Sequence, residues 1–248
     1  MKHSKFFSML LFVALPFILL SCGGGATDNT EQAGTDTTAS TPAPEPAAPA
    51  VNTIVTTPQS MVMVLHKVSN FEKWKTVYEA DDSSRLANGI HNYVIGRGLR
   101  DSNMVLVVMK ADDMEKAKAR AKTPALKKTM QKAGVTGTPE FLYITTTWQD
   151  TVNIGDAIRS RTIMNIKDYT TWEKNFQDGK QERLDNGITD RAYGYDASDK
   201  TKVSLVTAVT DTTKAFAYYN SDALKKRREA GGVSGEPKRF LFRIAKRY

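Results

Sequence analysis

Cysteine and histidine are scarce in this chain of 248 residues, and their scarcity excludes several kinds of active site. Cys22 is the only cysteine, so the chain can form no internal disulfide and must be held together by its core. The three histidines are His3, His66 and His91. Because His3 lies in a predicted signal segment, we predict neither a histidine metal triad nor a Ser-His-Asp triad in the mature chain. We also expect no cysteine nucleophile and no cofactor.

Residues 1–22 have the pattern of an export signal. Lys2 and Lys5 precede an apolar run over residues 6–20, which is short for a membrane span. The run ends in LLSC at Cys22, which resembles the lipobox of bacterial lipoproteins. The resemblance implies cleavage before Cys22 and its acylation, hence a lipid anchor in the cell envelope, in the outer rather than the inner membrane. The alternative is an ordinary secretory signal that ends in an incidental cysteine.

Large apolar residues are nearly absent from the next segment, residues 23–60. It is rich in threonine and alanine and contains five prolines. Such a composition cannot bury enough apolar surface to offset the entropy cost of ordering the chain. We therefore predict a disordered tether that holds a folded module away from the membrane.

The rest of the chain contains an internal repeat with an offset of 98 residues. Residues 62–144 align with residues 160–242 without a gap, and 22 of the 83 pairs are identical. Shared segments include RLANGI and RLDNGI, and GVTGTP and GVSGEP. A constant register of this kind predicts two copies of one folded unit, at residues 61–148 and 160–248, joined by a linker at 149–159.

Each repeat shows the same order of predicted elements. Asn70 and Asp168 are expected N-caps of first helices that end near residues 87 and 185, and Gly89 and Gly187 are expected left-handed turns. Second helices are expected from residues 113 and 211, each with a break and a fresh N-cap at residues 123 and 221. The expected strands are residues 61–68, 90–98, 104–110 and 141–148, and residues 161–166, 188–196, 203–209 and 239–246.

The order β-α-β-β-α-β predicts two ferredoxin-like α+β units. The segments VMVLH and VLVVM have no polar face, so we expect both faces of each four-stranded antiparallel sheet to be covered. If the two sheets face each other, they form a barrel with internal pseudo-two-fold symmetry, which is an internal dimer in a chain that can be monomeric. This organisation resembles the dimeric α+β barrel superfamily, which includes antibiotic-biosynthesis monooxygenases. The resemblance implies a pocket between sheet and helices but no single chemistry.

Two duplicated motifs invite a functional interpretation. Arg85 and Arg183, in RLANGI and RLDNGI, could hold an anionic ligand at a pocket mouth, or could bind the carbonyls at a helix end as structural caps. We favour the cap, because a cap is needed twice. GVTGTP and GVSGEP lack the GK[ST] ending of a phosphate loop, and we expect flexible connections between helix and strand there.

The remaining candidates are two aromatic positions and three positions that differ between the repeats. Trp74 and Trp172 could stack on a flat ligand, but their helical spacing favours core packing. His66, His91 and Arg97 have no counterpart of their kind in the second repeat, which has Met164, Thr189 and Tyr195 at the aligned positions. The histidines are acid/base or haem-ligand candidates if both point into the first pocket, although a buried His66 and an exposed His91 without a role are the favoured interpretation.

Three functional hypotheses remain open. The first is a lipid-anchored envelope protein, not an enzyme, that binds a small apolar or anionic ligand or a partner. The second, by analogy with the superfamily, is a cofactor-free monooxygenase or isomerase that uses His66 and His91. The third rests on charge: the chain carries +8, and residues 222–248 hold nine Lys and Arg against three acidic residues, which could contact anionic glycans or lipids. Nucleic acid is not expected as a partner of an exported lipoprotein.

The lipid anchor can be tested by replacing Cys22 with serine. Because acylation requires the thiol, we expect Cys22→Ser to move the protein from the membrane to the soluble fraction of fractionated cells. If the variant stays with the membrane, the lipoprotein prediction is wrong.

Overall fold

The computed structural model describes residues 52–248. The predicted signal peptide (1–22), with Cys22, and most of the predicted tether lie outside the described residues. No helix in the described part is long and apolar enough to cross a membrane. The elements are β1 (Ile54–Val55), β2 (Gln59–Val68), α1 (Phe71–Ala80), α2 (Asp82–Leu86), β3 (Ile90–Gly98), β4 (Met104–Ala111), α3 (Met114–Ala121), α4 (Pro124–Lys132), β5 (Val135–Asp150), β6 (Ile158–Ile166), α5 (Tyr169–Asp178), α6 (Lys180–Asp185), β7 (Ile188–Asp196), β8 (Asp199–Val209), α7 (Thr212–Tyr219), α8 (Asp222–Ala230) and β9 (Val233–Arg247).

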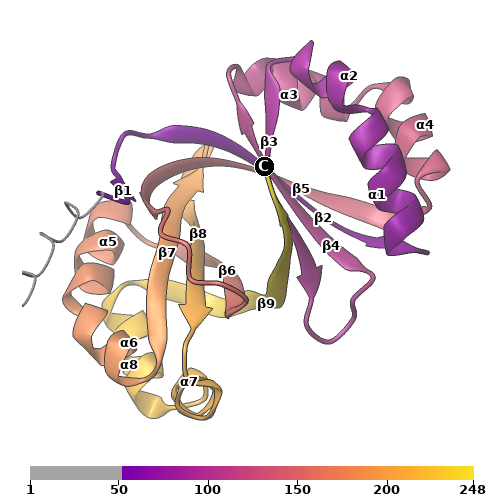
Figure 1. The fold of residues 1–248 in the computed structure, drawn as a ribbon. Helices are drawn as coiled ribbons and strands as arrows, with labels where there is room; N and C mark the ends of the chain where they lie inside the picture. The colour runs from indigo at the N-terminus through magenta and orange to yellow at the C-terminus, as the bar shows by residue number, and fades with distance from the viewer. Residues whose placement is uncertain (1–51) are drawn as a thin grey trace, which may run out of the picture. The chain divides into compact units, whose positions relative to one another are not determined.

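All strands belong to one antiparallel sheet that closes on itself. The strand order is β1-β5-β2-β4-β3-β9-β6-β8-β7, and β7 also pairs with β5. The two long-range junctions, β3 with β9 and β7 with β5, involve strands at equivalent places in the two repeats. Helices α1–α4 lie along one part of the sheet and α5–α8 along the opposite part (Figure 1). The prediction of an α+β fold with a large antiparallel sheet is confirmed.

The helices begin where the sequence predicts and end earlier. Asn70 and Asp168 accept hydrogen bonds from the backbone amides of Lys73 and Thr171, as N-caps do. The first helix of each repeat, however, is interrupted at Asp81 and Gly179, so the single helices expected to residues 87 and 185 are each two short helices. The second of these positions is a glycine for a packing reason: a Cβ on Gly179 would lie 2.8 Å from Cδ of Arg227.

The strands extend further than predicted, and four segments expected to be loop or linker are partly strand. Strands β5 and β9 begin at Val135 and Val233, so GVTGTP and GVSGEP lie mostly in strands instead of loops. Val135 pairs with Val68 beyond a bulge in β2, and this pairing satisfies backbone groups that a free loop would leave to water. Residues 52–60 of the predicted tether belong to the fold, because β1 pairs with β5 and β2 begins at Gln59. The predicted linker 149–159 shrinks in the same way, to residues 151–157.

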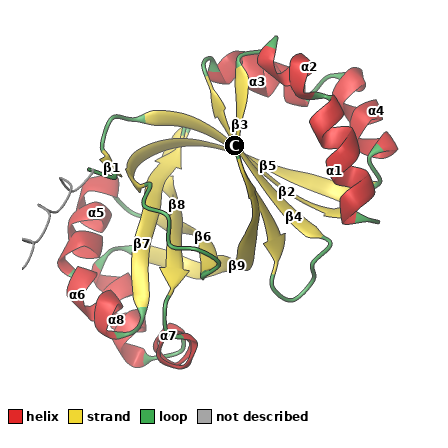
Figure 2. Cartoon of the chain, in the orientation of Figure 1, coloured by secondary structure: helices red, strands yellow, loops and turns green. Residues whose placement is uncertain are grey.

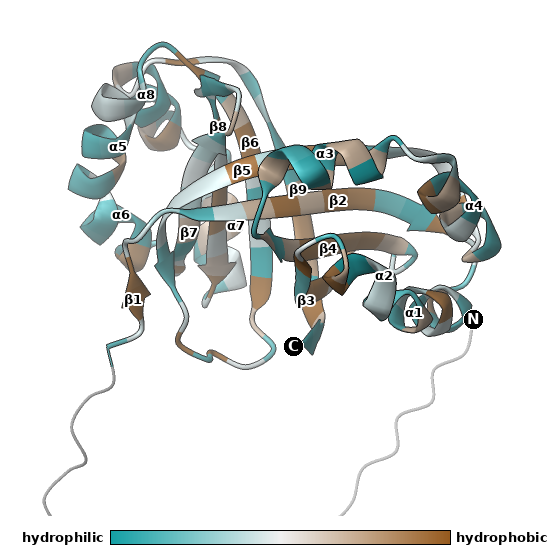
Figure 3. Ribbon diagram, turned by 90° about the horizontal axis from the view of Figure 1, so that it is seen from above, coloured by the Kyte–Doolittle hydropathy of each residue, from teal (hydrophilic) through white to brown (hydrophobic). Residues whose placement is uncertain are grey.

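Apolar side chains cover both faces of the sheet, as predicted from strand sequences in which polar and apolar residues do not alternate. One set packs between the sheet and α1–α4 and includes Val64, Trp74 and Val107. A second set, with Met63 and Leu142 among its members, packs on the opposite face of the same strands, inside the closed sheet. Figures 2 and 3 show this layering: the helices lie outside the strands, and hydrophobic segments concentrate in the strands.

Glycine occupies an equivalent position at each junction of the closed sheet. Gly96 pairs with Ile244 across β3 and β9, and Gly194 pairs with Thr146 across β7 and β5. A Cβ on Gly194 would lie 2.1 Å from the carbonyl oxygen of Thr145, whereas a Cβ on Gly96 would meet only the side chain of Phe242, at 2.4 Å. The first clash is with rigid backbone and the second with a ring that can rotate.

Gly194→Ala should therefore destabilise the fold more than Gly96→Ala. Overpacking of this kind costs about 1–3 kcal/mol, and we expect the upper part of that range for Gly194→Ala and less for Gly96→Ala. Chemical denaturation of the two variants beside the wild type measures the difference. If both variants lose the same free energy of unfolding, the conclusion that sheet closure depends on close backbone contact at Gly194 is wrong.

Candidate functional site

Each repeat contains a pocket between its helices and the outer face of the sheet. The first-repeat pocket (lined by His66, Trp74, Tyr78, Arg85 and Phe141, among others) has a volume of about 60 Å³. The second-repeat pocket (lined by Trp172, Arg183, Tyr218, Arg228 and Arg239, among others) has a volume of about 80 Å³. Under the 98-residue offset, 14 of the 15 residues that line the first-repeat pocket align with residues that line the second; Asp81 is the exception, and Ile188, Tyr219 and Val233 line the second pocket only. Most differences between the pockets are therefore differences in side chains at shared positions.

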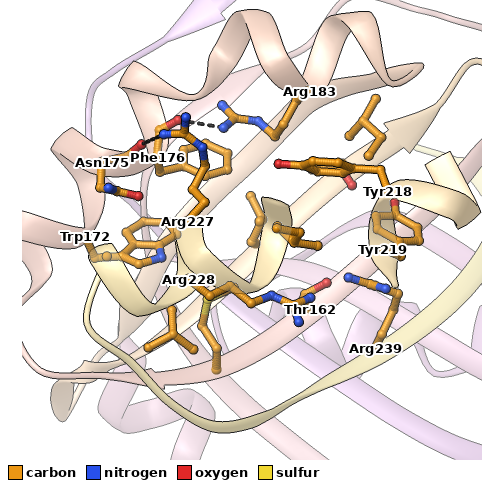
Figure 4. Close-up of a pocket in the computed structure, with 17 residues that line it drawn as sticks. Thr162, Trp172, Asn175, Phe176, Arg183, Tyr218, Tyr219, Arg227, Arg228 and Arg239 are labelled. Carbon is orange, nitrogen blue, oxygen red and sulfur yellow. Dashed lines mark hydrogen bonds between the residues drawn. The ribbon is translucent and has the colours of Figure 1, made fainter. Parts of the chain in front are cut away.

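The second-repeat pocket is the more basic of the two. Arg227, Arg228 and Arg239 line it, whereas the aligned residues of the first repeat are neutral, and they line the first-repeat pocket: Thr129, Met130 and Phe141. Arg227 is neutralised within the fold, because its Nε donates to Glu182 Oε2 at 2.6 Å. Arg228 and Arg239 form no ion pair among residues 52–248, and Figure 4 shows both side chains directed toward the same part of the pocket.

Arg239 and two tyrosines leave polar groups without partners in this pocket. The guanidinium of Arg239 stacks on the ring of Tyr219 at 3.5 Å, and its Nε has no hydrogen-bond partner in the described part of the chain. The hydroxyls of Tyr218 and Tyr219 are likewise buried and unpartnered there. Burial raises the pKa of Tyr218 to about 12, so Tyr218 remains a neutral donor at pH 7. Burial also lowers the pKa of Arg239 and of Arg228. Both still carry their charge, because arginine is not deprotonated in proteins. The pocket thus offers several unused hydrogen-bond donors around apolar walls.

The first-repeat pocket contains one titratable group of interest, His66 of β2. The residue is 4% exposed, and neither ring nitrogen has a hydrogen-bond partner within residues 52–248. Its ring lies 5.5 Å from that of Trp74, which stacks in turn on Tyr78. Burial lowers the pKa of His66 to about 4, so the imidazole is neutral at pH 7.

The arginines of the duplicated motif line the pockets but are occupied by internal partners. Arg183 forms a bidentate pair with Asp190, with both N–O distances 2.7 Å, and its Nη1 donates to the carbonyl of Phe176 at 2.6 Å. Arg85 donates to Asn92 at 2.9 Å and to Asp82 at 3.2 Å. The cap interpretation therefore needs correction: the main partners are side chains of the neighbouring strand and helix, because buried guanidinium groups require carboxylate or amide acceptors. Trp74 and Trp172 pack in the cores of their repeats, as expected, while each also contacts its pocket.

Two other candidates lie outside both pockets. His91 is 47% exposed in its side chain and pairs with Asp112 at 2.9 Å, so it does not join His66 in the first-repeat pocket. Arg97 stacks on Phe71 and donates to the carbonyl of Ser102 at 2.9 Å. Both belong to strand β3, and a sequence pattern cannot show that their side chains leave the pocket region.

Haem does not fit the residues that the sequence offered for it. The cavity beside His66 holds about 60 Å³, less than half of the roughly 150 Å³ that accommodates benzene, and a porphyrin is far larger. His91 cannot supply a second ligand from the surface. Within residues 52–248 no group of three His, Cys, Asp or Glu side chains could hold a metal ion.

The low pKa of His66 predicts a pH dependence of stability that its replacement should remove. The unfolded chain binds a proton near pH 6.5 and the folded chain only near pH 4. The contribution of His66 to stability is therefore complete above about pH 6.5 and is lost as the pH falls toward 4, at up to about 1.4 kcal/mol per pH unit. His66→Met, which installs the residue of the aligned position 164, should flatten this part of the curve in denaturation experiments at pH 7, 5.5 and 4.5. His91→Ala is the control, and an unchanged slope in His66→Met would contradict the neutral, unpartnered His66.

No protein-family model matches the chain, and no curated protein matches its sequence. Solved structures, by contrast, are similar along most of it. A chlorite dismutase variant from Candidatus Nitrospira defluvii aligns with a TM-score of 0.53 and 12% identity, over 77% of this chain and 93% of its own. An anthrone oxidase-like protein aligns with a TM-score of 0.51 and 15% identity, over 78% and 94%. A candidate monooxygenase from Fusobacterium nucleatum aligns with a TM-score of 0.50 and 13% identity, over 76% and 93%. At these identities the similarity establishes the α+β fold alone, and the chemistry has to be argued from the site.

Proposed function

We propose that the protein binds a small organic anion in the second-repeat pocket. The observation that carries the proposal is the combination of apolar walls with two cations, Arg228 and Arg239, that form no ion pair among residues 52–248. Glu236 favours the charged form of Arg228 but forms no ion pair with it. A buried or half-buried cation without an internal partner costs free energy, and an anionic ligand would remove that cost. The unpartnered hydroxyls of Tyr218 and Tyr219 add donors for the same anion.

The size of the pocket limits the ligand. A volume of about 80 Å³ is roughly half of the 150 Å³ or so that holds benzene, so the apolar part of the ligand should be short. We propose a carboxylate with a few carbon atoms, whose oxygens face Arg228 and Arg239 and whose chain lies near Trp172 and Leu224. Arginine suits this task because its planar fork can bind both oxygens of a carboxylate at once.

The cellular setting is part of the same proposal. The sequence of residues 1–22 supports export and a lipid anchor at Cys22, which would hold the binding module at a bacterial envelope. The equivalent junctions β3–β9 and β7–β5 support an internal pseudo-dimer of two ferredoxin-like units that arose by duplication. The basic segment 222–248 supports an outer contact surface less well, because Arg227, Arg228 and Arg239 line the pocket and Lys246 pairs with Glu79 at 2.6 Å.

A second candidate function is acid–base chemistry in the first-repeat pocket. It is favoured by one observation, the buried His66 whose two nitrogens have no partner among the described residues and whose neighbours are Trp74 and Tyr78. Similarity to an anthrone oxidase-like protein gives it a precedent in the fold. Two observations weigh against it: a pKa of about 4 makes His66 a weak base, and a cavity of about 60 Å³ is too small for a three-ring compound such as anthrone. If this second function is correct, the substitution His66→Ala should abolish any catalytic activity that is found for the protein.

Binding can be tested with a series of carboxylates of increasing size: acetate, butyrate, hexanoate and benzoate. We expect affinity to rise from acetate to butyrate and to stop rising once the acid no longer fits. The double variant Arg228→Met, Arg239→Phe restores the first-repeat residues and should weaken binding about tenfold or more, since a hydrogen bond to a charged group contributes about 1.5–3 kcal/mol. Isothermal titration calorimetry measures both effects.

The matched control is Lys226→Met, which removes an exposed cation from the same helix, α8. If the control weakens binding as much as the double variant, the effect is one of general charge and the pocket is not the site. If no carboxylate of the series gives saturable binding to the wild type, the proposed ligand class is wrong.

A further inference from the structure

The interior of the closed sheet holds a third cavity, separate from the two pockets under the helices. This barrel cavity has a volume of about 90 Å³ and is lined by residues of both repeats. Three arginines reach it: Arg159 of β6, Arg191 of β7 and Arg247 of β9. Arg247 is exposed, so the cavity extends to the surface at the end of β9.

Arg191 and Arg247 belong to the second repeat, and Arg159 immediately precedes it in β6. Under the 98-residue offset the three positions correspond to Met61, Tyr93 and Gln149, and these residues line the same cavity. Equivalent positions of the two repeats therefore meet in one space, where one repeat contributes neutral side chains and the other contributes cations. The positive charge of this cavity comes from the arginines of β6, β7 and β9.

The fold neutralises only one of the three cations. Arg191 pairs with Asp150 at 3.1 Å and also donates to the carbonyl of that residue at 2.6 Å. Arg159 is 2% exposed, and its partners within residues 52–248 are the backbone carbonyls of Ala157 and Gly155, not a carboxylate. Arg247 forms no ion pair in the described part of the chain. Among the residues that line the cavity, three arginines face one acid, Asp150, which is an excess of two positive charges. Asp156, an exposed residue outside the lining, offsets part of the charge of Arg159.

The arginines also repel each other. Burial, and then the charges of Arg191 and Arg247, lower the pKa of Arg159 to about 10, and the carboxylate of Asp156 opposes them only in part. The guanidinium remains charged at pH 7, so the repulsion is present under ordinary conditions and is not removed by loss of a proton. Three guanidinium groups around a small cavity are costly unless an anion shares them.

We propose that the barrel cavity binds a phosphate group, either free or as the head of a small phosphate monoester. A doubly charged tetrahedral oxyanion balances the excess of two charges, whereas one carboxylate would leave a positive charge uncompensated. A phosphate group carries about −1.5 to −2 charges at pH 7 and offers several oxygens to guanidinium forks from different strands. A cavity of about 90 Å³ has room for a phosphate group but not for a nucleotide. The opening at Arg247 would let the organic part of a phosphate monoester extend out of the cavity.

This site is distinct from the pocket of the proposed function. Arg159, Arg191 and Arg247 line the barrel cavity, and Arg228 and Arg239 line the second-repeat pocket on the other face of the sheet. Variants that restore first-repeat residues are available for each: Arg159→Met and Arg247→Gln in the barrel cavity, and Arg228→Met in the pocket. Phosphate binding and carboxylate binding can therefore fail independently.

The experiment is a calorimetric titration of the purified protein with sodium phosphate and with glycerol 3-phosphate at pH 7.5 and constant ionic strength. We expect saturable binding to the wild type, at least tenfold weaker binding to Arg159→Met, several-fold weaker binding to Arg247→Gln and no change in Arg228→Met. Tighter binding of glycerol 3-phosphate would identify a monoester head, and tighter binding of phosphate would identify the free ion. Phosphate should also raise the melting temperature of the wild type but not that of Arg159→Met.

Three results would overturn the proposal. The first is the absence of saturable binding of both phosphate compounds to the wild type. The second is an equal thermal effect of chloride at the same ionic strength, which would indicate charge screening alone. The third is undiminished phosphate binding in Arg247→Gln. Arg247 is an exposed residue at a strand end, so this variant should fold. It therefore keeps the test decisive even if Arg159→Met does not fold.

Discussion

Closure of the sheet is the constraint on which the other features of residues 52–248 depend. The pairings of β3 with β9 and of β7 with β5 give both edges of each four-stranded half a partner, so the backbone groups of those edges are satisfied within the chain. Closure also creates an inside and an outside of the sheet. Helices cover the outside, and side chains from both repeats fill the inside. The junctions also explain the glycines at positions 96 and 194, where a Cβ would clash with the side chain of Phe242 and with the backbone of Thr145.

Much of this architecture can be predicted from the sequence because it depends on local signals that occur twice. The N-caps Asn70 and Asp168, and the left-handed Gly89 and Gly187 with φ of 65° and 67°, are properties of short segments. The residues at which β5 and β9 begin cannot be predicted from local signals of this kind. Their first residues pair with β2 and β6, and the gain from long-range pairing overrides the loop preference of glycine and proline in GVTGTP and GVSGEP.

The candidate sites were less predictable, because a cavity joins residues that are distant in the sequence. A scan for chemistry selects His66 and His91 as rare residues, but only the fold shows that one is buried in a pocket and the other pairs with Asp112 at the surface. The arginines of the second repeat were visible only as an excess of positive charge. A comparison of aligned positions could have found them, since Met130 and Phe141 align with Arg228 and Arg239, but it could not have shown that these positions face one pocket.

The contrast between paired and unpaired arginines separates structural roles from binding roles. Arg183 lies in the same pocket as Arg239, yet it has a bidentate carboxylate partner at 2.7 Å, as a buried structural cation requires. Arg239 has only the face of Tyr219, and Arg159 only backbone carbonyls, among residues 52–248. A fold that supplies Asp190 for one arginine has no physical obstacle to supplying acids for the others. Asp156 and Glu236 favour the charged forms of Arg159 and Arg228 without forming ion pairs with them, and Arg239 pairs with no carboxylate among residues 52–248. Ligands in the two cavities would supply the direct carboxylate or phosphate partners that these arginines lack.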